Sequence, residues 1–227
     1  MANSEHLRLV LSPDWNEWRG RNTGVTPDLT NADLSGKDIS GKDLRRADMT
    51  RVNLSGATMA GTDFSRAILT MSRFEGASGP GAIFEHCDLD FLDLTGTFLA
   101  GARMRSASLQ SCNLLQANFA GADLTLTKLE GSDLNGANFA GATLCDVNFR
   151  GVKLYGAHFD GLVNYLPAVD DFTGKYLLHS EASLTMPVID FISAKFALVD
   201  EYSKPPPTDT QSNSLFITFG VSVAWGT

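Results

Sequence analysis

The stretch GSDLNGANFAGATL, residues 131–144, decides the fold, because a large apolar residue recurs in it at every fifth position. The same frame runs from Leu29 to Phe159, and 26 of its 27 positions hold Leu, Ile, Met or Phe, with Gly79 as the exception. An α-helix cannot have this period, since successive members would advance by about 140° and scatter around the axis. The repeat therefore predicts a solenoid of short extended segments joined by tight turns.

Each five-residue unit has a fixed pattern around its large residue, which we name the centre. In an extended chain the residue two positions before the centre points to the same side. There the sequence usually has Ala, with Cys87 and Cys112 as variants. The residue between the two is most often Asp or Asn, and we expect it to face water. Glycine recurs two positions after the centre, where the backbone is expected to turn a corner.

The segments ADLSG, ANFAG, SDLNG and GANFAGATL resemble the repeats of the pentapeptide-repeat family. The resemblance covers residues 27–161 and implies a right-handed quadrilateral β-helix, an all-β fold with four pentapeptides in each square coil. This stretch would form six to seven coils and, at a strand spacing of about 4.8 Å, a rod roughly 30 Å long. Residues 20 apart in the sequence would then stack on one another, and stability would come mainly from neighbouring coils.

One unit departs from the pattern within EGASGPGAIF, residues 75–84, where Gly79 holds a centre position and Pro80 follows it. One side of one coil should therefore lack its core side chain. We expect a local distortion there, which is either a tolerated imperfection or a small functional recess.

The segment before the repeats, residues 1–26, is expected to cover the open end of the solenoid, because an uncovered end would pair with another copy. Ser12 is a suitable N-cap for a short helix with Pro13 at its first position and Gly20 just past its end. Trp15 and Trp18 then lie three residues apart on one face of this helix. We predict that these indoles cap the first coil.

The segment after the repeats, residues 162–227, is predicted to be a β-strand appendage. Alternating polarity indicates antiparallel strands over about 175–186, 191–202 and 214–225. The stretch Ser183–Trp225 also resembles the last strands of a family of bacterial outer-membrane β-barrels linked to salt stress. Three strands cannot close a barrel, which needs about eight. The favoured expectation is a small sheet on the solenoid end or on a second subunit, and membrane association is the alternative.

The composition gives no indication of catalysis. The four histidines are scattered, the three cysteines are too far apart for a zinc site or a disulfide framework, and no phosphate or dinucleotide motif occurs. We therefore expect a non-catalytic protein without metal or cofactor. The net charge of −8 argues against direct nucleic-acid binding. With no signal peptide and no apolar run near the roughly 20 residues of a membrane span, the expected location is the cytoplasm.

The preferred function is that of a rigid protein-binding or scaffold element. The candidate contact patch is Ile68, Met71 and Phe91, because these apolar residues occupy positions of the repeat that face outward. Packing of the C-terminal strands on the same residues is the competing interpretation. The partner is a protein of unknown identity, and a homodimer is an alternative.

The alternative function is mimicry of DNA, because some pentapeptide-repeat proteins are acidic rods that occupy the DNA site of gyrase. The candidate acidic face comprises Asp33, Asp93 and Asp133. Basic residues interrupt the outward columns, which makes the repeats a poor imitation of a phosphate backbone. The sequence therefore favours the scaffold over the mimic.

Overall fold

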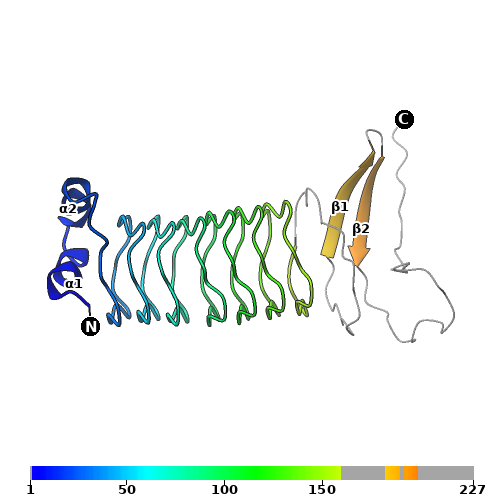
Figure 1. Ribbon diagram of the computed structural model, residues 1–227. Helices are drawn as coiled ribbons and strands as arrows, with labels where there is room; N and C mark the ends of the chain where they lie inside the picture. Colours follow the sequence, from blue (N-terminus) through cyan, green and yellow to red (C-terminus); the bar gives the residue numbers. More distant parts are fainter. Residues whose placement is uncertain (1, 160–181, 190–191, 199–227) are drawn as a thin grey trace.

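The computed structural model describes residues 2–159, 182–189 and 192–198. Two short helices, α1 (Ser4–Val10) and α2 (Trp15–Arg21), precede a solenoid that begins at Asp28 (Figure 1). Strands β1 (Ala182–Ile189) and β2 (Ile192–Leu198) follow it in the sequence.

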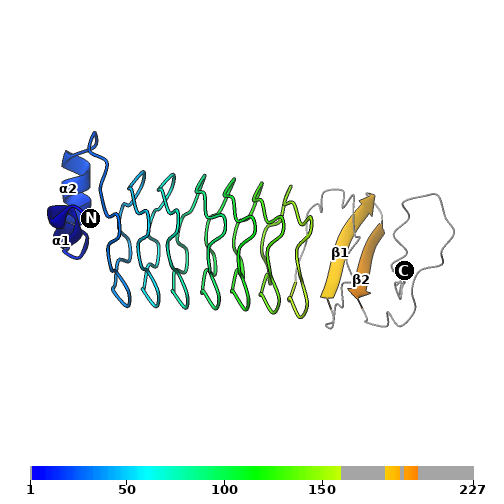
Figure 2. The ribbon, with the colours of Figure 1, turned by 60° about the horizontal axis from the view of Figure 1, so that its bottom comes forward.

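The repeats stack into a right-handed quadrilateral β-helix, as predicted. Parallel bridges join residues 20 apart, from Asp28 and Asp48 at one end to Asn138 and His158 at the other. The coils follow one another along a straight axis (Figure 2). We name the four sides A to D after their first centres, Leu29, Leu34, Ile39 and Leu44, and the turn after each side takes the same letter. Residues 20 apart therefore share a side or a corner.

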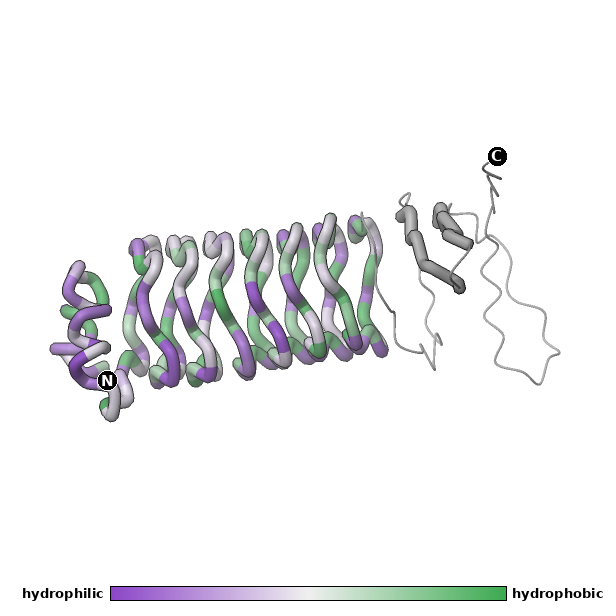
Figure 3. The backbone as a smooth tube through the Cα atoms, turned by 90° about the horizontal axis from the view of Figure 1, so that it is seen from above, coloured by the Kyte–Doolittle hydropathy of each residue, from purple (hydrophilic) through white to green (hydrophobic). Residues whose placement is uncertain are grey.

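The centres form the core, while hydrophilic and hydrophobic residues alternate along every coil (Figure 3). Aromatic centres stack in ladders: the ring centroids of Phe64 and Phe84 lie 4.8 Å apart, and those of Phe139 and Phe159 lie 5.0 Å apart. Because the interior is narrow, a large centre fits only beside a small neighbour, which explains the alanine two positions earlier.

Some of these small inward positions hold Ser, Thr or Cys, and the structure shows why a polar atom is tolerated there. The Thr62 hydroxyl donates to the Ile39 carbonyl at 2.7 Å, and the Cys87 thiol lies 3.0 Å from the Phe64 carbonyl oxygen. Most inward donors thus reach the carbonyl of a centre 23 residues earlier, whereas the Thr97 hydroxyl donates to the Leu94 carbonyl, three residues earlier, at 2.8 Å. The buried hydroxyls at these positions are therefore satisfied. The other members of the set are Ser72, Cys112, Thr127 and Ser132.

The outward Asp and Asn residues do more than face water, since they cap the turns. Asp28 Oδ1 accepts a hydrogen bond of 3.0 Å from the backbone N–H of Thr30, two residues on. This contact holds a local turn without using a ladder hydrogen bond. It recurs at Asp33, Asp38, Asp43, Asp48, Asn53, Asp63, Asp88, Asp93, Asn113, Asn118, Asp123, Asp133, Asn138 and Asn148.

The four corners differ in the residue that takes the left-handed backbone. At corner C this residue is glycine in every coil from Gly41 to Gly141, as expected where φ is near +65°. At corner D it is never glycine between Arg46 and Asp146, and at corner A the first glycine is Gly131. Corners A and D therefore project side chains where corner C has none.

The distortion predicted at Gly79 is wrong. The Gly79 N–H donates to the Phe98 carbonyl at 2.7 Å, and the Pro80 carbonyl accepts from the Gly61 N–H at 3.0 Å, so the ladder is unbroken. The Met59 side chain of the preceding coil fills the space, because a Cβ on Gly79 would lie only 2.8 Å from Met59 Cγ. No recess is left at this centre.

The N-terminal segment also differs from the prediction. It has two helices, and α2 begins at Trp15 instead of Pro13 and includes Gly20. The residue before α2 is Asp14 and not Ser12, whose hydroxyl donates to the Leu9 carbonyl at 3.0 Å and accepts from the Asp14 N–H at 3.2 Å. The Asn3 side chain caps α1 by accepting from two backbone N–H groups of its first turn.

At the C-terminus, β1 and β2 form a two-stranded antiparallel sheet, in which Ala182 pairs with Leu198 and Ile189 with Ile192. The register shifts between Pro187 and Ile189. The predicted third strand at 214–225 lies outside the described residues, as do the links that would place this sheet against another surface.

Candidate protein-interaction site

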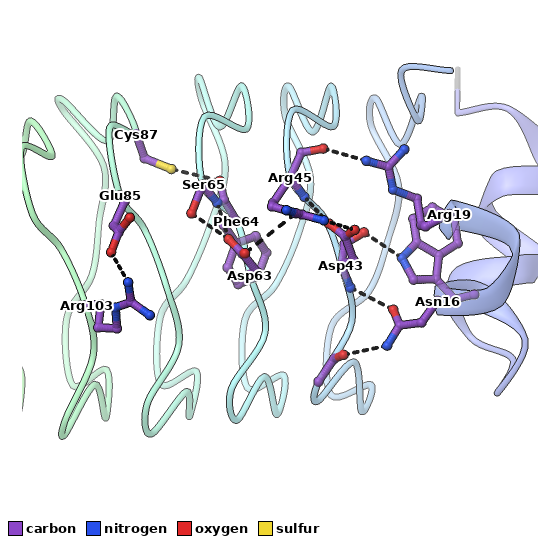
Figure 4. A network of polar contacts seen from close by, with 12 residues as sticks. Asn16, Arg19, Asp43, Arg45, Asp63, Phe64, Ser65, Glu85, Cys87 and Arg103 are labelled. Atoms are coloured by element: carbon purple, nitrogen blue, oxygen red, sulfur yellow. Dashed lines mark hydrogen bonds and ion pairs between the residues drawn. The ribbon is translucent and has the colours of Figure 1, made fainter. Parts of the chain in front are cut away.

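The first coil presents an open edge, which the N-terminal helices cover with side-chain groups. The indole N–H of Trp15 donates to the Asp43 carbonyl at 2.8 Å. The Asn16 side-chain amide replaces the hydrogen bonds of a missing strand. Its oxygen accepts from the Asp43 N–H and its nitrogen donates to the Gly41 carbonyl, both at 2.8 Å (Figure 4). Side D of the first coil is thus paired although no coil precedes it.

Side A of the first coil is covered in the same way. His6 Nδ1 accepts from the Asp28 N–H at 3.0 Å, and the Asp28 carbonyl accepts from the Asn3 N–H at 3.1 Å. Trp15 is fully buried and stacks on the half-buried Trp18 with ring centroids 5.3 Å apart. The two indoles therefore lie in the covering layer, and Trp15 offers no surface to a partner.

The apolar residues Ile68, Met71 and Phe91 lie on the surface and close together in the coil register. Their exposed fractions are 49%, 64% and 80%. Met71 and Phe91 occupy corner A in successive coils, and Ile68 lies on side A between Asp48 and Asp88. The fold thus brings together the three residues that the sequence proposed as a contact patch.

Met71 and Phe91 are also held in an unfavourable backbone conformation. Their φ angles are 60° and 62°, in the left-handed region that bulky residues rarely adopt. Each costs about 1 kcal/mol relative to glycine, which other corners use at the same position. Two large apolar side chains therefore stand in water at positions where folding alone would favour glycine, which is typical of a surface retained for binding.

A shallow hollow lies beside these residues. Its volume is about 340 Å³, and Arg51, Asn53, Met71 and Arg73 line it. The sequence analysis did not place the two arginines with the patch. The 20-residue register could have done so, because Arg51 lies one coil before Met71 at corner A and Arg73 follows Met71 by two residues.

The candidate acidic face lies in one column of side B, but other residues separate its members. Bridges connect Asp33, Asn53, Arg73, Asp93, Asn113, Asp133 and Lys153 in that order. Asp133 forms an ion pair with Lys153 at 3.1 Å, and Asp33 accepts from the Asn53 amide at 3.2 Å. Hydrogen bonds from Ser35 lower the pKa of Asp33, which keeps it charged but also engages it in its own turn.

Comparison with known families agrees with this geometry. The sequence matches the family described as Pentapeptide repeats, with eight copies over residues 28–66, 59–90, 87–125 and 122–161. The chain belongs to the pentapeptide-repeat family. The match ends at residue 161, so the resemblance of the C-terminal stretch to outer-membrane strands stays a prediction.

Several solved structures are similar to this pentapeptide-repeat protein. QnrB1, a plasmid-mediated fluoroquinolone resistance protein, is 23% identical over 58% of this chain and 74% of its own, with a TM-score of 0.29. Rfr23 from the cyanobacterium Cyanothece 51142 is 22% identical over 64% and 97%, with a TM-score of 0.32. HetL from Nostoc sp. strain PCC 7120, involved in heterocyst differentiation regulation, is 30% identical over 56% and 66%, with a TM-score of 0.22.

These likenesses are too low to indicate what the pentapeptide-repeat protein binds. No curated protein matches it.

The possible metal ligands of this pentapeptide-repeat protein are scattered in the part of the chain that the structure describes. No cluster of three or more His, Cys, Asp or Glu there could hold a metal ion. Burial raises the pKa of the Cys87 and Cys112 thiols to about 12, so both are unreactive near neutral pH. Across residues 2–159 and the strands β1 and β2, no helix is long and apolar enough to span a membrane.

Proposed function

We propose that this chain is a non-catalytic, rigid protein-binding element, and that its contact surface is the patch formed by Ile68, Met71 and Phe91. The observation that carries the proposal is Phe91, which is 80% exposed and has a φ of 62°. A bulky apolar residue in that backbone conformation gains nothing from folding, so a bound partner is the better reason for its presence.

The solenoid sets the spacing of the patch. Between the Met71-bearing coil and the next one, the Gly76 N–H donates to the Thr95 carbonyl at 3.0 Å, whereas the N–H groups of Leu69 and Met71 donate no ladder hydrogen bond to that coil. The bridge between Ile68 and Asp88 keeps the two coils in register, so the backbones of Met71 and Phe91 lie about one coil, roughly 4.8 Å, apart. Two anchors at a regular spacing reduce the rearrangement that a partner requires on binding.

Site-specific photo-crosslinking in cells tests the proposal. A benzophenone amino acid replaces Phe91 in the full chain, and a matched control places it at Leu126, which is 45% exposed with a φ of 60° but lies at corner D. We expect position 91, and not position 126, to crosslink to one discrete protein, and Met71→Ser to reduce that product. Crosslinks from position 91 that reach only residues 162–227 would show that the C-terminal segment covers the patch, and the proposal would be wrong.

Mimicry of DNA has less support, because Arg73 and Lys153 interrupt the acidic column of side B. The test is a gyrase supercoiling assay with the wild-type chain and a variant in which Asp33, Asp93 and Asp133 are all changed to Asn. We expect neither protein to inhibit, since one negative charge per coil cannot reproduce the dense charge of a duplex. Inhibition by the wild type that the variant loses would favour the mimic instead.

A further inference from the structure

Two residues of the apolar patch, Ile68 and Met71, lie within a concentration of positive charge that the net charge of the chain does not reveal, whereas Phe91 follows in a stretch with Asp88, Asp90 and Asp93. Residues 45–75 contain five arginines and three acidic residues, whereas the whole chain has a net charge of −8. Arg45 is paired with Asp43 at 2.8 Å. The other four form no ion pair within the described part of the chain; they are Arg46, Arg51, Arg66 and Arg73.

These four arginines lie beside Ile68 and Met71, on both flanks of side A. Arg46 and Arg66 stack at corner D, on one flank of side A, and Arg51 lies at corner A on the other flank. Arg51 and Arg73 line the hollow next to Met71. All four are exposed, so their guanidinium groups are available to a partner.

The nearby acids that the structure describes form no ion pair with these four arginines. Asp48 Oδ1 accepts from the Thr50 N–H at 3.1 Å and its hydroxyl at 2.7 Å, and Asp93 Oδ1 is held in the same way by Thr95. Asp88 accepts from the Asp90 N–H at 3.1 Å. These carboxylates accept hydrogen bonds within their own turns, and none forms an ion pair with one of the four arginines.

We propose that the occupant of this patch is an acidic, extended segment of a partner protein that carries at least one large apolar side chain. Its apolar side chain would pack on Met71 and Phe91, and its carboxylates would pair with Arg51 and Arg73 across the hollow. This inference rests on the proposed function and adds the chemistry of the partner. Guanidinium groups bind carboxylates through paired hydrogen bonds, which gives such a site both charge and geometric selectivity.

The test is a selection of random 12-residue peptides displayed on phage against the immobilised full chain. We expect the selected peptides to be enriched in Asp and Glu around an apolar residue. Fluorescence anisotropy of one such peptide should show weaker binding at higher salt, and a loss of about tenfold or more with Arg51→Glu/Arg73→Glu. A matched control, Arg150→Glu, changes an exposed arginine near the C-terminal end of the solenoid and should leave affinity unchanged.

Reversing the charges on both the protein and the peptide shows whether a loss of binding comes from charge or from misfolding. A peptide whose acids are replaced by Lys should bind the Arg51→Glu/Arg73→Glu variant better than it binds the wild type, which a misfolded variant could not do. Thermal unfolding followed by circular dichroism checks the fold of each variant.

The outcomes separate this inference from the proposed function. Selected peptides without an excess of Asp or Glu, bound equally by Arg51→Glu/Arg73→Glu but lost with Met71→Ser/Phe91→Ser, would overturn the acidic partner and leave the protein-binding patch in place. If binding of every selected peptide survives Met71→Ser/Phe91→Ser, both are wrong. Occupation of the patch by a second copy or by residues 162–227, detected by crosslinking from position 91, also overturns the inference.

Discussion

The packing of Met59 over Gly79 allows a double-mutant cycle that tests how the core compensates for a missing centre. A Cβ at Gly79 would lie 2.8 Å from Met59 Cγ and 3.2 Å from Ala82 Cβ. The Gly79→Ala substitution should therefore destabilise the protein by about 1–3 kcal/mol through overpacking. Met59→Ala removes a fully buried side chain and should cost about 2–5 kcal/mol.

The two substitutions together should cost less than their sum. With Met59 shortened to Ala, the methyl group introduced by Gly79→Ala occupies part of the vacated space, so most of the overpacking penalty disappears. We expect a coupling free energy of about 1–3 kcal/mol. Guanidinium chloride unfolding of the four proteins, followed by circular dichroism, measures it from the transition midpoints.

An additive control is available in α2. A methyl group added at Gly20 would meet no atom within 4 Å, so Gly20→Ala should stabilise the helix by about 0.5–1 kcal/mol. Its effect should add to that of Met59→Ala. If Gly79→Ala is neutral in the wild type, or if its effect adds to that of Met59→Ala, then Met59 does not fill the space at Gly79 and the reasoning fails.

Three further predictions concern the surface, the thiols and the turns. Phe91→Gly should leave the free energy of unfolding unchanged or raise it by up to about 1 kcal/mol, because it relieves a left-handed backbone conformation and removes little buried surface. Binding of the partner should become weaker. A lower Tm for this variant would contradict the prediction. Cys87 and Cys112, with pKa values raised by burial to about 12, should react with a maleimide at pH 8 only after denaturation, as mass spectrometry would show. Hydrogen bonds from turn residues lower the pKa of Asp28 and Asp33 in the folded protein, so their contribution to stability is present above the unfolded pKa and is lost as the pH falls. The Tm should therefore hold between pH 7 and 5 and decrease below about pH 4, and a Tm that rises on acidification would refute the role of these carboxylates.

The sequence was sufficient to predict the solenoid, because its signal is repeated many times. A five-residue period with a large centre and a small neighbour leaves one regular solution, and a residue such as Leu109 is buried for the same reason as Leu29. The outward position of Phe91 follows from the same register. In a repeat fold, the position of a residue that departs from the pattern follows from its residue number alone.

Features that depend on a single contact were not predictable in this way. The unbroken ladder at Gly79 depends on how one flexible side chain, that of Met59, turns toward it. The beginning of α2 was not predictable from Ser12, because its hydroxyl bonds both the Leu9 carbonyl before it and the Asp14 N–H after it, and the helix begins only after Asp14. The register places Arg51 and Arg73 near Met71, but the hollow that they line depends on side-chain direction across two coils.

The square coil also determines which changes of length the protein can tolerate in evolution. Inserting or deleting 20 residues shifts everything that follows by one coil, about 4.8 Å, without rotating it. A change of five residues preserves the core pattern equally well but turns the rest of the rod by a quarter of a revolution. Such a change between Arg51 and Phe91 would leave the interior intact while moving the two residues to different corners. The interior therefore permits length changes in steps of five, whereas a surface that combines residues of several coils permits them only in steps of 20.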